Sequence, residues 1–285
     1  MDRCHGEVTI DMIFIRNGWT SAKKQFPIAI LLFLYELLWG VFLYKIIQSA
    51  ITPVLQRYPD PGPGELSRFL FLIEGQLGLS ENPSLRLYAA LLAGMVFLRL
   101  VLTPLIRAGI YHGLLEERER DGAGWLFFEG IRTKWKPVSI FYAGELLLSL
   151  APAYWILPQL FKRLSLLLNG DQKALMYTAG LLLAWVLWAY AIKKCLEYML
   201  LGWLSHTGML SSLLWCIRRI LRVISISVIL GAASLIVFLL FTSASWFWTG
   251  LLGLILHQIY PFFRSFLGIW QTASQFHLWK TGTQK

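Results

Sequence analysis

The chain has 285 residues, of which 56% are hydrophobic and only 15% are charged, and its formal net charge is +10. A soluble domain of this length carries more charge, and several apolar runs reach the roughly 20 residues that cross a bilayer. These runs lack the alternation of polar and apolar residues seen in the strands of an outer-membrane barrel. The composition therefore excludes an ordinary soluble domain and predicts an all-α, polytopic membrane helix bundle.

The apolar runs predict six transmembrane helices in one integral membrane domain. They cover 26–47, 87–107 (running on to 115), 137–157, 175–192, 220–241 and 246–264. Consecutive spans pair into three hairpins, at 26–115, 116–205 and 206–285. A cytoplasmic arm with an interfacial helix precedes them at 1–25, a long outer loop lies at 48–86, and the third hairpin ends in a cytoplasmic tail.

The distribution of Lys and Arg predicts the orientation. One set of connections, together with the two termini, carries 17 basic residues, whereas the alternate loops carry 6. Because cytoplasmic loops of membrane proteins are enriched in Lys and Arg, we expect both termini to be cytoplasmic. The predicted location is the cell (cytoplasmic) membrane of a bacterium.

A basic, Trp-containing stretch precedes each odd-numbered span, at 17–30, 129–140 and 213–226. We interpret these stretches as amphipathic helices in the cytoplasmic interface, where their cations reach anionic phospholipid headgroups. The predicted headgroup-binding rim consists of Lys23, Lys24, Arg132, Lys134, Lys136, Arg218, Arg219 and Arg222. A three-fold helix-hairpin repeat explains the recurrence. The alternative is that any cytoplasmic boundary collects Trp, Lys and Arg.

Charged residues also occur inside the predicted spans. Glu145 lies eight residues beyond Pro137, and Arg99 lies eight residues before Arg107. At 1.5 Å per residue, both are about 12 Å from the cytoplasmic boundary, on spans expected to be neighbours. Since a lone charge at this depth costs roughly 2.5–3.5 kcal/mol, we expect Glu145 to pair with Arg99.

Two further residues complete a predicted intramembrane polar cluster. Glu36 is about 15 Å deep in the first span, and His257 is about 10 Å deep in the last. Glu36, Arg99, Glu145 and His257 could form a pathway for protons, ions or a small solute. The alternative is a polar core that fixes helix register.

No motif in the sequence predicts catalysis. There is no Walker loop, no GxSxG and no HExxH. The three cysteines, Cys4, Cys195 and Cys216, form neither a CxxC pair nor a zinc-binding set with His. We therefore predict no catalytic residue, no metal, no cofactor and no enzymatic activity.

Residues 107–135, RAGIYHGLLEERERDGAGWLFFEGIRTKW, combine the end of a span, an acidic-basic turn and a Gly- and Trp-bearing amphipathic helix. This layout resembles bacterial six-span integral membrane proteins of the group that includes the membrane domain fused to glycerophosphodiester phosphodiesterases. The resemblance implies a membrane module without established chemistry, since the phosphodiesterase is a separate soluble domain and nothing in this chain resembles it.

The predicted function is a non-enzymatic membrane module or scaffold. Its basic rim would engage the bilayer through anionic phospholipid headgroups, or else a partner protein or a second copy of the chain. The cationic residues flank apolar spans, so nucleic acid is not an expected partner. The alternative prediction is a small transporter or permease that uses the intramembrane polar cluster.

Overall fold

The computed structural model describes residues 2–56, 83–116, 123–168, 171–247 and 251–283. These residues form helices and short turns and contain no strand, which confirms the all-α prediction. The helices are α1 (Asp2–Lys24), α2 (Phe26–Gln56), α4 (Pro83–Leu115), α5 (Ala123–Leu150), α6 (Ala153–Leu168), α7 (Gln172–Leu204), α8 (Met209–Arg218), α9 (Ile220–Phe247) and α10 (Leu251–Thr283).

Five helical segments of the described chain are long and apolar enough to cross a membrane. They are Phe26–Ser49, Ala90–Leu115, Gly124–Arg163, Gln172–Leu204 and Ile220–Trp246. The protein is therefore a multi-pass membrane helix bundle. The predicted sixth span, 246–264, includes residues 248–250, which lie outside the described residues.

In the first hairpin, the helices on both sides of the outer loop are longer than the sequence predicts. Helix α2 continues to Gln56 and α4 begins at Pro83, so the predicted outer loop, 48–86, is helical at both margins. Residues 57–82 lie outside the described residues. In the second hairpin Pro152 separates α5 from α6, because proline cannot donate a helical hydrogen bond and disfavours helix in the residue before it.

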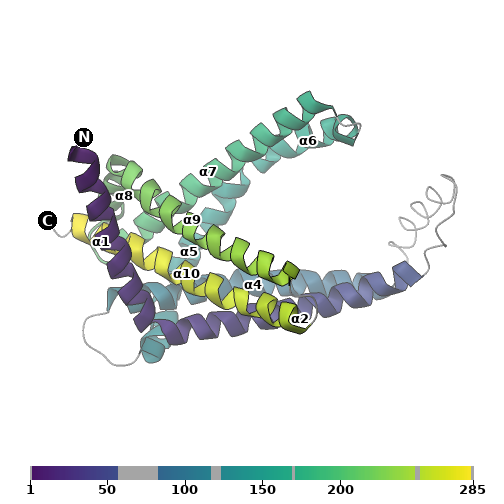
Figure 1. Cartoon of the computed structure of the whole chain (residues 1–285), viewed down its shortest axis with the longest axis horizontal. Coiled ribbons are helices and arrows are strands. Elements are labelled where there is room, and N and C mark those ends of the chain that lie inside the picture. The colour runs from purple at the N-terminus through teal and green to yellow at the C-terminus, as the bar shows by residue number, and fades with distance from the viewer. Residues whose placement is uncertain (1, 57–82, 117–122, 169–170, 248–250, 284–285) are drawn as a thin grey trace.

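Helices α1, α8 and the C-terminal end of α10 lie together at the left of Figure 1, whereas α2 and α4 on one side and α6 and α7 on the other extend away from them toward the right. We call α1, residues 123–136 of α5, and α8 the rim helices, and α4, α7 and α10 the return helices. The most extensive packing joins α4 to α5, α7 to α8 and α10 to α1. Each rim helix thus packs on the return helix of the preceding hairpin, and α1 closes the ring against α10, as a three-fold repeat requires.

A glycine allows close approach at each of these three junctions. A Cβ at Gly18 would lie 2.7 Å from the backbone of Ser274 in α10. A Cβ at Gly130 would lie 2.5 Å from that of His112 in α4, and one at Gly202 would lie 2.5 Å from the carbonyl oxygen of Gly208 before α8. These distances are too short for a side chain, so the three junctions depend on glycine.

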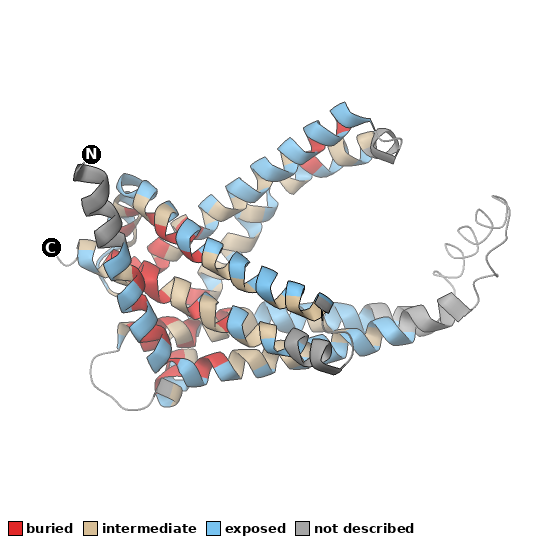
Figure 2. Ribbon diagram, viewed as in Figure 1, coloured by how far each residue is buried: buried red, intermediate tan, exposed pale blue. Residues whose placement is uncertain are grey.

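Buried residues gather where the rim helices meet the return helices (Figure 2). We call this part the basic end, because it carries the predicted rim. Toward the hairpin turns α2 and α4 diverge from α6 and α7, and their apolar side chains are exposed. We call this part the splayed half.

The residues of the predicted cytoplasmic tail that the structure describes are helical and packed, and their cytoplasmic location stays a prediction. Helix α10 continues without interruption to Thr283, and Ala273, Phe276 and Leu278 are fully buried in the main core. A helix with apolar residues at such spacing buries one face, and here that face packs on α1, α8 and α9.

Candidate functional site

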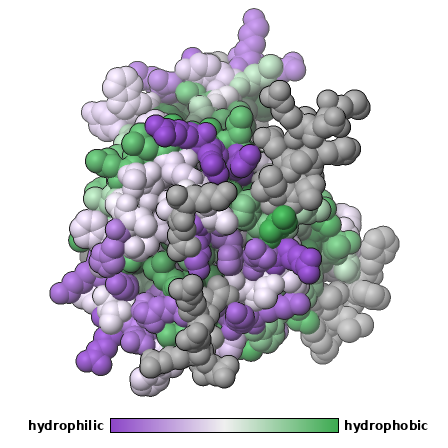
Figure 3. Space-filling model, turned by 90° about the vertical axis from the view of Figure 1, so that its left-hand side faces the viewer, coloured by the Kyte–Doolittle hydropathy of each residue, from purple (hydrophilic) through white to green (hydrophobic). Residues whose placement is uncertain are grey.

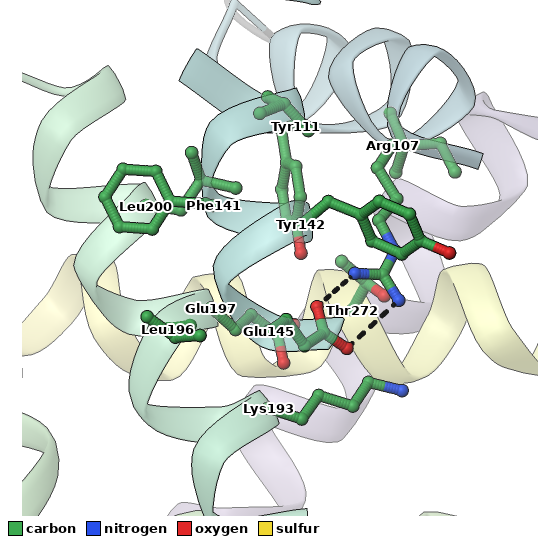
Figure 4. Close-up of a pocket in the computed structure, with 12 residues that line it drawn as sticks. Arg107, Tyr111, Phe141, Tyr142, Glu145, Lys193, Leu196, Glu197, Leu200 and Thr272 are labelled. Carbon is green, nitrogen blue, oxygen red and sulfur yellow. Dashed lines mark hydrogen bonds and ion pairs between the residues drawn. The ribbon is translucent and has the colours of Figure 1, made fainter. Parts of the chain in front are cut away.

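Glu145 of α5 forms an ion pair with Arg107 of α4 (Figure 4). Arg107 Nη1 lies 2.5 Å from Glu145 Oε2, and Nη2 lies 3.4 Å from Oε1. The two side chains are only 29% and 17% exposed, respectively. A guanidinium that meets a carboxylate with both nitrogens gives a directional, charge-assisted contact.

The predicted pairing of Glu145 with Arg99 is wrong. Arg99 is exposed, and its guanidinium lies over the ring of Trp39 in α2, 5.4 Å from the centroid. The prediction counted depth from Arg107 and Pro137 as if spans began there, but both residues lie inside continuous helices. The equal separations of eight residues, from Arg107 to Arg99 and from Pro137 to Glu145, therefore do not bring the two charges to the same depth.

The ion pair lines a cavity of about 100 Å³ between α4, α5, α7 and α10, which has room for several water molecules. Tyr142 lies beside the pair, with the Arg107 guanidinium 5.1 Å from its ring centroid. Tyr111 is buried on α4, and Thr272 contributes from α10. With Glu197 from α7, all four helices supply a polar group to this cavity.

Helix α7 adds a second buried ion pair next to the cavity. Lys194 Nζ lies 2.8 Å from Glu197 Oε2, and both side chains are only 9% exposed. Glu197 lines the cavity and lies near the phenol of Tyr111. Lys193 also lines the cavity but is exposed. Figure 4 shows Arg107, Lys193, Glu145 and Glu197 around the cavity. With Lys194, which pairs with Glu197, three cations and two carboxylates meet here and give a net charge of +1.

The other members of the predicted polar cluster do not join this cavity in the described part of the chain. Glu36 is half-buried on α2 near Tyr35, whose phenol also lies in the field of Arg99. His257 belongs to α10, but its side chain lies outside the described residues. Of the four predicted residues, the structure places Glu145 in the charged cavity.

Sequence reasoning missed Arg107, Tyr111, Tyr142, Lys194 and Glu197 as site residues. Arg107, Lys193 and Lys194 served only to count boundary charges. A usable signal was present, because Lys194 and Glu197 are three residues apart and so share one face of a helix. A carboxylate within the apolar run that follows Lys194 is as informative as Glu145.

The predicted headgroup rim lies at the basic end. None of its eight side chains is buried: six are exposed, and Lys134 and Arg222 are half-buried. Figure 3 looks onto this end and shows hydrophilic side chains spread over it, with hydrophobic ones between them. Hydrophilic and hydrophobic groups thus share this face.

Each rim helix carries a cation over a Trp ring. Lys23 Nζ lies 5.4 Å from the ring centroid of Trp19 in α1, and Lys136 Nζ lies 6.0 Å from that of Trp135 in α5. The Arg219 guanidinium, which directly follows α8, lies 5.5 Å from the ring centroid of Trp215. The same cation–π contact thus recurs in all three units.

A buried polar network holds the ring together beneath the rim. Gln275 Nε2 of α10 donates to Ser227 Oγ at 2.8 Å and to the Val223 carbonyl at 3.1 Å, both in α9. The Tyr198 hydroxyl of α7 donates to Gln275 Oε1. One side chain therefore links α10 to α9 of its own hairpin and to α7 of the second hairpin.

Comparison with known proteins provides no further assignment, since no family model, no curated protein and no solved structure matches this chain. Function must therefore be argued from the charged cavity and the basic end.

Proposed function

We propose that this protein is a non-enzymatic module of the cell membrane that holds anionic phospholipid headgroups at its basic end. The observation that carries the proposal is the Trp–cation contact repeated in the three rim helices. Trp prefers the membrane–water interface, and each Lys or Arg near an anionic surface adds roughly 1 kcal/mol of attraction. A ring of three such contacts suits a surface parallel to the bilayer.

The proposal places both termini on the cytoplasmic side. The excess of Lys and Arg in the connections of the basic end supports this orientation. The resemblance of residues 107–135 to the six-span group with a membrane domain beside a soluble enzyme fits the same proposal, because such a module would act through its membrane contacts. Scaffolding of lipid would need no catalytic residue.

The test compares thermal stability in nanodiscs of phosphatidylcholine with stability in nanodiscs that also contain phosphatidylglycerol. We expect the anionic lipid to raise the Tm, because it binds only the folded rim. A variant with Lys23, Arg132 and Arg219 all changed to Gln should lose most of this increase.

The matched control removes three cations from the opposite, turn side, by changing Lys162, Arg163 and Lys173 to Gln. It should keep the full increase in Tm. Equal losses in the two triple variants would mean that net charge alone, and not the rim, attracts the lipid. Such a result would refute the proposal.

A second candidate function, a small transporter, is favoured by the charged cavity. Glu145 and Glu197 line one cavity with room for several water molecules between four helices, which is the kind of site that binds a proton or a small ion. A Glu145→Gln variant that folds but loses solute flux in liposomes would support transport. Unchanged lipid dependence of Tm in that variant would separate the two functions.

A further inference from the structure

Two apolar grooves occupy corresponding junctions of the ring. The first groove, about 720 Å³, lies between return helix α4 and α5, and Val101, Pro104 and Ala143 contribute to its walls. The second groove, about 600 Å³, lies between return helix α10 and rim helix α1, with α2 and α9 alongside. In both cases a return helix meets the rim helix of the following unit.

Each groove is lined by a cation and a Trp from a rim helix. Arg132 and Trp135 line the first groove, and Lys23 and Trp19 line the second. All four side chains are exposed. Apart from these residues the walls are mainly aliphatic and aromatic, including Phe262 and Phe266 in the second groove.

This combination has the chemistry of a phospholipid. An apolar channel accommodates a hydrocarbon chain, the Trp lies at headgroup level, and the cation attracts a phosphate. A peptide is a poor occupant at this depth, because its backbone amides would lack hydrogen-bond partners among the hydrocarbon-like walls.

We infer that each groove binds one acyl chain of an anionic phospholipid, whose phosphate lies on Arg132 in the first groove and on Lys23 in the second. This inference rests on the proposed function, since it requires the basic end to face an anionic leaflet. It adds two defined sites with a stoichiometry of two lipids per chain.

The test is native mass spectrometry of the full chain released from nanodiscs of equal parts phosphatidylglycerol and phosphatidylcholine. We expect two retained phosphatidylglycerol molecules for the wild type and one each for Arg132→Gln and Lys23→Gln. The double variant should retain none. Arg16→Gln is the matched control, because Arg16 is exposed on the same helix as Lys23 but neither lines the groove nor belongs to the predicted rim, and it should retain two.

Filling a groove tests the acyl chain independently of charge. Ala143 lines the first groove and Ala233 the second, so Ala143→Phe and Ala233→Phe should each remove one retained lipid. Retention of two lipids in these variants would overturn the inference, even if Arg132→Gln lost one. Equal retention of the two lipid types by the wild type would also overturn it.

The outcome separates this inference from the proposed function. If phosphatidylglycerol raises the Tm but no lipid is retained, the rim attracts lipid without the grooves, and only the groove assignment fails. If it neither raises the Tm nor is retained, both fail.

Discussion

The basic end and the splayed half are built from the same helices but bury their side chains differently. In α9, Val223, Ile226 and Leu230 are buried near the basic end, whereas Leu235 and Leu240 farther along are 57% and 64% exposed. Each exposed leucine would cost roughly 1.5–3 kcal/mol in water relative to burial. The splayed half is therefore suited to hydrocarbon, where exposure of apolar side chains carries no such penalty. Packing between the helices of the chain is concentrated at the basic end.

The largest effect should come from the ion pair that links the two regions. Arg107→Leu and Glu145→Leu should each lower the free energy of unfolding by about 3 kcal/mol, because one charge remains buried without its partner. The double variant should recover most of the loss. Chemical unfolding in mild detergent measures all three variants.

Arg99 supplies the control for this pair. Since Arg99 is exposed over Trp39, Arg99→Leu should not rescue Glu145→Leu. Wild-type stability of Glu145→Leu alone would show that the carboxylate does not hold α4 and α5 together, and would contradict the structural role of the pair.

Glycine substitutions compare the two regions directly. Gly18→Ala should destabilise by about 1–3 kcal/mol, because the added Cβ meets the backbone of Ser274. Gly231→Ala, with no atom within 4 Å of the new Cβ, should be neutral or stabilising by up to about 1 kcal/mol. Thermal unfolding of the two variants distinguishes a packed junction from a lipid-facing helix, and equal Tm values would mean that α1 does not close the ring.

The polar network at the basic end should contribute less than the ion pair but should remain measurable. Gln275→Leu leaves the Tyr198 hydroxyl without its acceptor, at a cost of about 1–3 kcal/mol. Gln258→Leu, at an exposed position of the same helix, should cost almost nothing. A similar stability loss in both variants would show that the network is not a specific link between α7, α9 and α10.

The smallest effect concerns reactivity. Burial raises the pKa of the Cys216 thiol in α8 to about 12, because desolvation disfavours the thiolate. The thiolate fraction then stays near one part in a thousand at about pH 9, whereas an ordinary thiol with a pKa of about 8.5 is mostly ionised. In a Cys4→Ser, Cys195→Ser background, iodoacetamide should therefore modify Cys216 at pH 9 only after unfolding, and rapid labelling of the folded chain would contradict the packing of α8.

Sequence reasoning predicted the splayed half better than the basic end. Lipid-facing helices follow from local composition, so the runs beginning at Phe26 and Ile220 were sufficient to predict α2 and α9. The Trp-containing stretches at 17–30, 129–140 and 213–226 overlap the three rim helices, and their location in the membrane interface stays a prediction. Both predictions use only neighbouring residues.

Pairing and burial at the basic end depend on helix ends, rotation and crossing. For this reason the sequence prediction paired Glu145 with Arg99 and not with Arg107, and it did not predict that Gln275 near the end of α10 is fully buried. From sequence alone, a polar residue on a helix of mixed composition is predicted to be exposed. Its burial becomes clear only when the helices that satisfy its hydrogen bonds are known.

The most direct test of the comparison is the accessibility of nitroxide labels in liposomes. Single labels would replace Leu183 and Leu235 in the splayed half, and Thr207 and Arg218 at the basic end; all four side chains are exposed. We expect molecular oxygen to reach the first two labels and a polar nickel chelate to reach the last two. Ready access of the nickel chelate to Leu183 and Leu235 would mean that the splayed half faces water, and would contradict the account.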